Sequence, residues 1–385
     1  DNNSYFLLLL LQVFYFLYFA LITDSDYFEV FQSSLAIFSE YNNPNIFLSS
    51  YGFDTNLYLG LTFTMLQVIL GVNCFWIYRA GITSYTKHKI TSTPFLLGIG
   101  GDSATGKTTI SNALKAVFTP SKSISLEGDD MHKWQRGHKK WKEFTHLDPK
   151  ANLLHQEVGI LSNLKAGKKI SRRIYDHAKG TFGEENLIHP SNLIIFEGLH
   201  PFYITKQRLL FDLKIFMAPE KNLSNHWKIK RDIKERGYSK EEILELLNQR
   251  KEDSQKFIAS QKQYADIIIT PTTEGQLKNV GDENENPETV YKLSMPNSIF
   301  LEPILEQIIT IEGIDLEHTF IEDGRQAISL SGEVSTDTIS SIARFFIPGI
   351  EDIGVDSSQW PQGSFGILIL LLVYCIFEEA DYGKG

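Results

Sequence analysis

Residues 101–109, GDSATGKTT, have the composition and spacing of a loop that binds phosphate groups. Its glycines let backbone N–H groups surround an anion, while Lys107 can reach terminal phosphates and the Thr108 hydroxyl can ligate Mg²⁺. A helix that begins at the end of such a loop adds a favourable dipole. The stretch therefore predicts a nucleoside triphosphate site formed by Gly101, Asp102, Ser103, Ala104, Thr105, Gly106, Lys107, Thr108 and Thr109.

The phosphate acceptor must be bound by other residues. Transfer to a hydroxyl requires a carboxylate beside that hydroxyl and cations around the moving phosphoryl group. Residues 127–136, EGDDMHKWQR, supply two adjacent aspartates, a histidine and an arginine shortly after the loop. Two adjacent aspartates alone are more typical of a solvated turn, so this stretch is a candidate whose role depends on its neighbours.

Two further stretches carry charged residues where a kinase needs them. Glu197 follows the apolar run LIIF, and at the end of a buried strand its carboxylate could hold the water shell of a metal ion. In residues 227–239, WKIKRDIKERGYS, the spacing predicts that four charged residues share one helix face. Most charge-rich helices are simply solvated. The four are Lys228, Arg231, Asp232 and Arg236.

The elements that would position these residues alternate along the chain. A capping box, Ser239 with Glu242, predicts the start of a helix, and residues 111–118 predict the helix after the glycine loop. Short apolar runs between helices predict an α/β fold with a mostly parallel sheet. The predicted strands are 95–99, 193–196, 213–216 and 267–270, with SISLE before the aspartate pair also strand-like and 281–288 an acidic loop.

Composition limits the class of partner. With Lys and Arg numbering 37 and Asp and Glu 47, the net charge is 37 − 47 = −10, which does not favour a nucleic-acid partner. Two cysteines cannot build a disulfide framework, in keeping with a reducing compartment. A length of 385 residues allows two or three structural units.

Two long apolar runs precede the glycine loop. Residues 5–22 and 57–78 are each about long enough to cross the roughly 30 Å of hydrocarbon in a bilayer as a helix. A signal peptide is the alternative for the first run, but it lacks a basic lead-in and a small-residue cleavage site. We therefore expect a membrane anchor in residues 1–90 with two transmembrane helices, followed by a kinase domain in 91–385.

Charges around these runs predict their orientation. The segment between them has five acidic residues and no Lys or Arg, whereas Arg79, Lys87 and Lys89 follow the second run. By the positive-inside rule, the chain after residue 79 is expected in the cytoplasm, giving a multi-pass membrane protein that contacts the lipid bilayer. A third apolar run, 365–377, is short for a span and is expected to be a buried helix.

Seven ordered motifs together resemble those of phosphoribulokinase, in the wider group that includes uridine kinase. The resemblance covers about residues 95–380. Uridine kinases share the glycine loop and the aspartate turn but not LDPKAN with EGLHPFY and QKQYAD. The motifs are EGDDMHKWQR, LDPKAN (147–152), RIYDHAKG (173–180), FEGLHPFY (196–203), DLKIF (212–216), WKIKRDIKERGYS and QKQYADIII (261–269).

The resemblance implies a P-loop kinase fold, with ATP and Mg²⁺ as cofactors, that converts ribulose 5-phosphate to ribulose 1,5-bisphosphate. It implies that Asp129 is the base for the sugar hydroxyl and that Thr108 with Glu197 places Mg²⁺. Lys107, Lys228 and Arg231 would contact phosphates, with Asp232 orienting the cations. The residues implied in sugar-phosphate binding are His132, Arg136, Tyr175, His177 and Arg236.

The chain also departs from the family pattern. Thr105 and Glu127 stand where plant-type enzymes have cysteines, so a thiol switch is not expected, and two membrane helices are not part of the pattern. The acceptor could therefore be another pentose phosphate or a nucleoside. A catalytically silent, membrane-tethered nucleotide-binding scaffold is a further alternative, and the family often forms homo-oligomers.

Overall fold

The computed structural model of the chain divides into two units, residues 1–77 and 78–385. It describes residues 69–70, 94–119, 122–176, 179–275, 277, 279–282, 284–347, 350–351, 355–356 and 358–382. The fold below is that of the second unit. The predicted membrane helices at 5–22 and 57–78 lie outside the described residues except at 69–70 and stay predictions. Of the helices within the described ranges, none is both long and apolar enough to span a bilayer.

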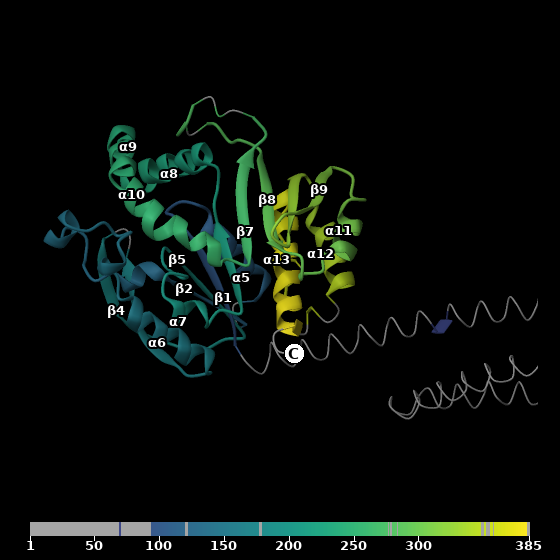
Figure 1. The fold of residues 1–385 in the computed structure, drawn as a ribbon, viewed down its shortest axis with the longest axis horizontal. Coiled ribbons are helices and arrows are strands. Elements are labelled where there is room, and N and C mark those ends of the chain that lie inside the picture. Colours follow the sequence, from purple (N-terminus) through teal and green to yellow (C-terminus); the bar gives the residue numbers. More distant parts are fainter. Residues whose placement is uncertain are drawn as a thin grey trace, which may run out of the picture. The chain divides into compact units, whose positions relative to one another are not determined.

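An eight-stranded sheet forms the centre of the described unit (Figure 1). Its first five strands are parallel and its last three are antiparallel additions at one edge. All the predicted strands are present, which confirms the α/β fold with a mostly parallel sheet. The order is β2 (Ser123–Glu127), β5 (Leu193–Gly198), β1 (Phe95–Gly101), β6 (Leu213–Met217), β7 (Ile267–Thr273), β8 (Thr289–Pro296), β10 (Arg325–Gly332) and β9 (Ile314–Ile321).

Helices cover both faces of this sheet, because its central strands are buried on both sides. In β1, Phe95, Leu97 and Ile99 belong to one hydrophobic core, whereas Leu96 belongs to the other. The first core includes α5 (Lys107–Val117), α11 (Glu302–Ile308), α12 (Thr336–Phe346) and α13 (Gly363–Tyr382). The second includes α6 (Leu154–Lys165), and the short α7 (Thr205–Arg208) lies beside it.

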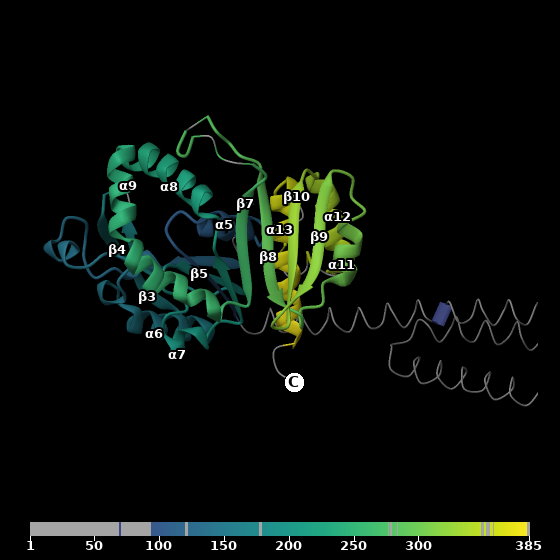
Figure 2. The ribbon, with the colours of Figure 1, turned by 45° about the horizontal axis from the view of Figure 1, so that its top comes forward.

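The apolar run 365–377 is a buried core helix, as predicted. It forms most of α13, and each residue from Ile367 to Val373 has no exposed surface. Figures 1 and 2 show α13 lying against the antiparallel half of the sheet, with α11 and α12 on its flank. A helix that is apolar all round is stable when it is enclosed in this way.

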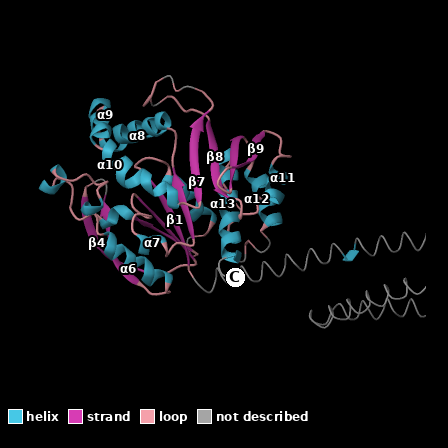
Figure 3. Cartoon of the chain, in the orientation of Figure 1, coloured by secondary structure: helices cyan, strands magenta, loops and turns pink. Residues whose placement is uncertain are grey.

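Several elements gather at the carboxyl ends of the parallel strands. Helix α8 (Lys221–Arg236) ends at Gly237, whose φ of 70° is favourable for glycine, and α9 (Lys240–Gln249) begins with the predicted Ser239–Glu242 capping box. A separate two-stranded ribbon, not predicted, pairs β3 (Ile170–Asp176) with β4 (Thr181–Ile188) (Figure 3). The remaining short turns are η1 (Gly128–Met131), η2 (Lys139–Lys142), η3 (Pro149–Ala151), α10 (Lys251–Asp253), η4 (Ser254–Ile258) and η5 (Ala259–Tyr264).

Candidate active site

The glycine loop connects β1 to α5, as predicted, and α5 begins at Lys107, four residues before the expected start. Gly101 has a φ of 149° and Gly106 a φ of 92°, while Ala104 adopts a left-handed φ of 62°. A Cβ atom on Gly101 would lie 2.8 Å from the carbonyl oxygen of Met217. Glycine is therefore required at Gly101 for both backbone angle and space.

Lys107 folds back over this loop. Its Nζ donates to the carbonyl oxygens of Gly101 at 3.0 Å and Asp102 at 2.5 Å. Burial lowers the pKa of Lys107, while the carboxylates of Glu197 and Asp102 oppose that shift. The ammonium group is thus held inside the loop that would surround phosphates.

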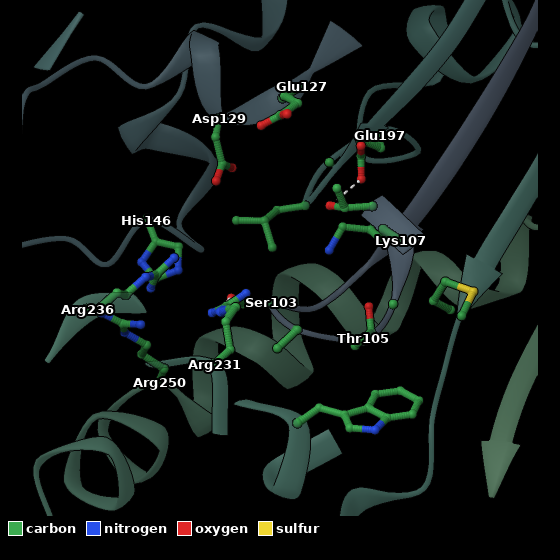
Figure 4. A pocket seen from close by; sticks show the side chains of 18 of the residues that line it. Ser103, Thr105, Lys107, Glu127, Asp129, His146, Glu197, Arg231, Arg236 and Arg250 are labelled. Carbon is green, nitrogen blue, oxygen red and sulfur yellow. Dashed lines mark hydrogen bonds between the residues drawn. The ribbon is translucent and has the colours of Figure 1, made fainter. Parts of the chain in front are cut away.

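Thr108 and Glu197 meet at the base of the loop. The Thr108 hydroxyl donates to Glu197 Oε2 at 2.9 Å, and Glu197 is buried at the end of β5 (Figure 4). Burial raises the pKa of Glu197, with Lys107 opposing the shift. In the described part of the chain, no cluster of three or more His, Cys, Asp or Glu could hold a metal ion alone. A hydroxyl beside a carboxylate fits Mg²⁺ that takes its other ligands from phosphates and water.

Asp129 lies on η1, directly after β2, and faces the glycine loop across a cavity of about 1200 Å³. Its side chain is 32% exposed, and Figure 4 shows it pointing into the space between Lys107 and the arginines of α8. In the sequence, Asp129 lies 20 positions after the end of the glycine loop at Thr109. The two come together because the parallel strands β1, β5 and β2 have their carboxyl ends at one edge of the sheet.

His132 is oriented toward Asp129 by the LDPKAN motif. Its Nδ1 lies 2.7 Å from Asn152 Oδ1, and its Nε2 lies 3.8 Å from Asp129 Oδ1. The Asn152 amide donates to the carbonyl oxygens of His146 and Asp148, so its oxygen must accept from His132. The Nδ1 of His132 therefore carries a proton, and its Nε2 faces the carboxylate.

The charged residues of α8 share one face around Asp232, as predicted. Asp232 is 3% exposed and lies 3.8 Å from Lys228 Nζ, 2.8 Å from Arg231 Nη2 and 3.5 Å from Arg236 Nη1. Arg231 Nη2 also donates to Ser103 Oγ at 3.1 Å. One buried carboxylate therefore fixes three cations beside the glycine loop.

Burial, with a smaller contribution from neighbouring cations, lowers the pKa values of basic groups at this end of the cavity. Burial lowers the pKa of Lys228 to about 8, although Asp232 opposes the shift. Burial also lowers the pKa of Arg250, with Arg236 adding to the effect. Burial and then the charge of Arg250 lower the pKa of His146 well below its ordinary value. These groups would all be stabilised by a bound anion.

His146 and Arg250 are among the residues of this charged end that were not singled out from the sequence. His146 immediately precedes LDPKAN, and Arg250 follows α9; both line the cavity near Arg236 (Figure 4). Tyr175, which was predicted, lies on β3 with its ring 5.5 Å from that of His132. His177 lies outside the described residues, so its predicted role has no structural account.

The opposite end of the cavity is apolar. Residues from α8, β6, β7, β8 and α13 meet there beyond Gly106, and none was predicted as a site residue. They are Met217, Trp227, Pro271, Tyr291 and Phe365. The cavity thus has a charged end beside Asp129, a glycine loop in the middle and an aromatic end.

Comparison with known proteins matches residues 96–277 to the description "Phosphoribulokinase / Uridine kinase family". A phosphoribulokinase of Synechocystis is 36% identical over 174 residues, 45% of this chain and 52% of that protein. The chloroplastic phosphoribulokinase of Triticum aestivum is 34% identical over 249 residues, 59% and 60% of the two chains. A uridine kinase of Lactococcus lactis is 31% identical over 191 residues, 48% of this chain and 91% of that protein.

The chain thus spans between half and two thirds of the first two relatives. A solved phosphoribulokinase structure from Rhodobacter spheroides matches the fold with a TM-score of 0.53 at 19% identity, covering 75% of this chain and 99% of that one. The sequence matches and this shared fold agree with a phosphate-binding loop between β1 and α5. The chain belongs to the phosphoribulokinase/uridine kinase family of P-loop kinases, phosphotransferases with an alcohol acceptor that use ATP with Mg²⁺.

Proposed function

We propose that this chain transfers the γ-phosphoryl group of ATP to a hydroxyl of a phosphorylated sugar, converting ribulose 5-phosphate to ribulose 1,5-bisphosphate. The observation that carries the proposal is a single cavity that contains the glycine loop, Asp129 and a cluster of cations. A neutral acceptor would not need so many cations at the charged end of the cavity. A substrate that already carries a phosphate would be held by them.

In this proposal, each part of the transfer falls to a residue that lines the cavity or borders it. Asp129 would accept the proton of the attacking hydroxyl, while His132 supports its carboxylate. Lys107 and Arg231 would neutralise charge on the transferred group, whose loose transition state needs positioning and charge stabilisation more than a strong nucleophile. Mg²⁺, held through Thr108 and Glu197, would supply charge neutralisation between the phosphates.

The acceptor phosphate would lie against the arginines and the other polar side chains of the charged end. Arg136, His146, Arg236 and Arg250 line the charged end with Tyr175. The backbone N–H of Arg136 donates to Gly180 O at 2.8 Å, which ties its loop to the β3–β4 ribbon. A sugar bound between this set and Asp129 would present a hydroxyl to the γ-phosphate, with the Asp129 carboxylate beside that hydroxyl.

A nucleoside acceptor is the second candidate. It is favoured by the Lactococcus uridine kinase, of which the chain covers 91%, and by the rings of Trp141 and Phe144 in the wall of the charged end. An ADP-release assay of the full chain with pentose phosphates and nucleosides would separate the candidates. Turnover with ribulose 5-phosphate supports the first candidate, and preference for a nucleoside supports the second. If none of the acceptors were phosphorylated, both candidates would be contradicted and a nucleotide-binding scaffold would be left.

We further propose that residues 1–90 anchor the kinase to a membrane, with the catalytic domain on the cytoplasmic side. Support comes from the sequence: two apolar runs, an acidic segment between them and basic residues after the second. Extraction of membranes from cells that express the full chain tests this proposal. Release of the chain by alkaline carbonate, without detergent, would contradict two spanning helices.

A further inference from the structure

The two aspartates of the EGDDM stretch point in different directions. Asp129 faces the cavity, whereas Asp130 is buried on the opposite side of η1 and bonds to β3. Asp130 Oδ1 accepts from the backbone N–H of Tyr175 at 2.6 Å, and Oδ2 accepts from Arg172 Nε at 3.2 Å. Asp130 therefore lies outside the cavity while its neighbour in sequence lines it.

Arg172 holds the same turn at a second point. It is 3% exposed, and its Nη2 donates to the carbonyl oxygen of Glu127 while its Nε donates to Asp130. One guanidinium group thus binds the residues on both sides of the Gly128–Asp129 pair. Because the group is planar and its donors are fixed relative to one another, the two contacts define the position of the turn between them.

A second carboxylate lies behind the guanidinium. Glu157 on α6 is 1% exposed, with Oε1 3.7 Å from Arg172 Nη2 and Oε2 accepting from Gln207 Nε2 at 3.2 Å. Glu157 and Asp129 also line a shared cavity of about 10 Å³ together with His200. Burial raises the pKa of Glu157 to about 8, with Arg172 opposing and Asp130 and Asp129 adding to the shift.

Of the two carboxyl groups around Arg172, Asp130 is favoured as its ionised partner. Two ionised carboxylates around one buried guanidinium would leave a net negative charge in a buried site, which is costly. A protonated Glu157 removes that charge and leaves the full charge of Arg172 for Asp130. The Arg172–Asp130 pair is then a balanced, buried link between β3 and the turn.

We propose that Arg172 and Asp130 are positioning residues that fix Asp129 against the acceptor hydroxyl. Neither lines the cavity, so they act through the turn and not on the substrate. The same pair also fixes the backbone of Tyr175, so the base and one wall of the acceptor end are set by one link. The inference rests on the proposed function in that it takes Asp129 as the base.

The test compares Arg172→Met, Arg172→Lys and Asp130→Asn in the full chain, with Arg173→Met as the matched control. Arg173 is the neighbour on β3, but its guanidinium lies 4.0 Å from the Phe182 ring and does not line the cavity. We expect kcat to fall roughly 10- to 100-fold in Arg172→Met, since a displacement of about 1 Å can cost about 100-fold. The KM for ATP should stay within about twofold, and Arg172→Lys should recover part of the rate.

Loss of one partner could leave a buried charge and prevent folding. The double variant Asp130→Asn with Arg172→Met removes both charges, and its rate should resemble that of either single variant because the two residues act as one unit. Folded single variants with the kcat of Arg173→Met would overturn the proposal. A KM for ATP that rises in step with the fall in kcat would also overturn it, since that indicates general damage.

Hydrogen exchange of the peptide 127–132 provides a readout that does not depend on turnover. We expect faster exchange in Arg172→Met than in wild type, and no change in Arg173→Met. If the wild-type protein phosphorylated none of the acceptors, the proposed function would fail. The hydrogen-exchange experiment would still test whether Arg172 and Asp130 hold the turn. Unchanged exchange in folded Arg172→Met would then overturn the inference independently.

Discussion

Arg231 Nη2 donates to Ser103 Oγ at 3.1 Å, which joins helix α8 to the glycine loop across 128 residues of sequence. The same Nη2 lies 2.8 Å from Asp232 Oδ1, so the guanidinium bridges the loop and the carboxylate that holds Lys228 and Arg236. The nucleotide loop and the cations of the charged end are therefore linked through one side chain. A phosphoryl group that leaves the loop toward Asp129 would pass beside it.

We expect Arg231→Lys to lower kcat by about 10²-fold or more, because a lysine keeps the charge but cannot bridge Ser103 and Asp232 together. Steady-state kinetics at saturating ATP would measure this change. The matched control is Lys230→Met, since Lys230 contacts the exposed Asn286 and does not line the cavity. Equal rates in the two variants would show that the bridge made by Arg231 does not support the transfer.

Asp129→Asn should bind ATP normally and lose most turnover. The amide keeps the size of the side chain but cannot take the proton of the hydroxyl, and loss of a positioned general base typically costs about 10²- to 10⁴-fold. Calorimetric titration with a non-hydrolysable ATP analogue would measure binding, and ADP release would measure rate. A variant with near wild-type turnover would remove Asp129 from the role of base.

The rate should fall at alkaline pH through Lys228. Burial lowers its pKa to about 8, so the ammonium is charged below that pH and neutral above it. Lys228 does not line the cavity, so its charge would act through Asp232 and the arginines that this carboxylate holds. If that charge supports the transfer, kcat/KM should decline as the pH rises through about 8, since that parameter reports the free enzyme. In Lys228→Arg the side chain stays charged, so the alkaline decline should move to higher pH. An identical pH profile in both proteins would contradict this role.

The glycine loop and the parallel strands could be predicted because their signals are local. Gly101 and Gly106 satisfy backbone angles at their own positions, and the buried strands are continuous apolar runs. The strands β8, β10 and β9 were missed because they contain no such run. Strand β10 alternates between buried and half-exposed residues, while β8 has two buried residues and β9 has one. Antiparallel strands with one covered face give this weaker pattern.

The part of the charged site that lies on one helix could be predicted from its spacing. The part that comes from separate segments of the chain was missed, because only the packing of the fold brings those segments together. Lys228, Arg231, Asp232 and Arg236 follow helical spacing, so one face could be inferred. Arg250 and His146 come from different segments and reach the same place through the fold. The different directions of Asp129 and Asp130 also depend on η1 and its contact with Arg172, which two adjacent aspartates in a sequence do not reveal.

The free energy of unfolding should depend on pH through Glu157. Burial raises the pKa of its carboxyl from 4.5 to about 8 in the folded chain, so folding favours the protonated form. Its stabilising effect is fully present below about pH 4.5 and is lost as the pH rises to about 8, with a slope approaching about 1.4 kcal/mol per pH unit. Denaturant unfolding across this range should show a weaker slope in Glu157→Gln. Parallel curves for the two proteins would mean that Glu157 is ionised at neutral pH.

The aromatic end of the cavity is the expected place for the base of ATP. Trp227 lies on α8 one residue before Lys228, and with Met217 it borders the loop at Gly106; a Cβ atom there would be 3.9 Å from Trp227 Cζ3 and 3.5 Å from Met217 Cε. Tyr291 and Phe365 continue this wall, with ring centroids 5.9 Å apart. A base that extends from phosphates in the loop would leave the charged end and enter this one.

We therefore expect Trp227→Ala to raise the KM for ATP about 5- to 150-fold, since stacking a base on an aromatic ring is worth about 1–3 kcal/mol. The acceptor KM should change little, because Asp129 and the arginines lie on the other side of the loop. Trp227→Phe should keep most of the affinity, and Phe345→Ala, an exposed aromatic on α12 that does not line the cavity, serves as control. Among the side chains that define the aromatic end, Tyr291 carries the one hydroxyl, so binding by stacking should not depend on the polar groups at the edge of the base. The affinity for GTP should therefore fall in Trp227→Ala by a similar factor. A loss confined to ATP would instead indicate that the protein recognises the edge of adenine.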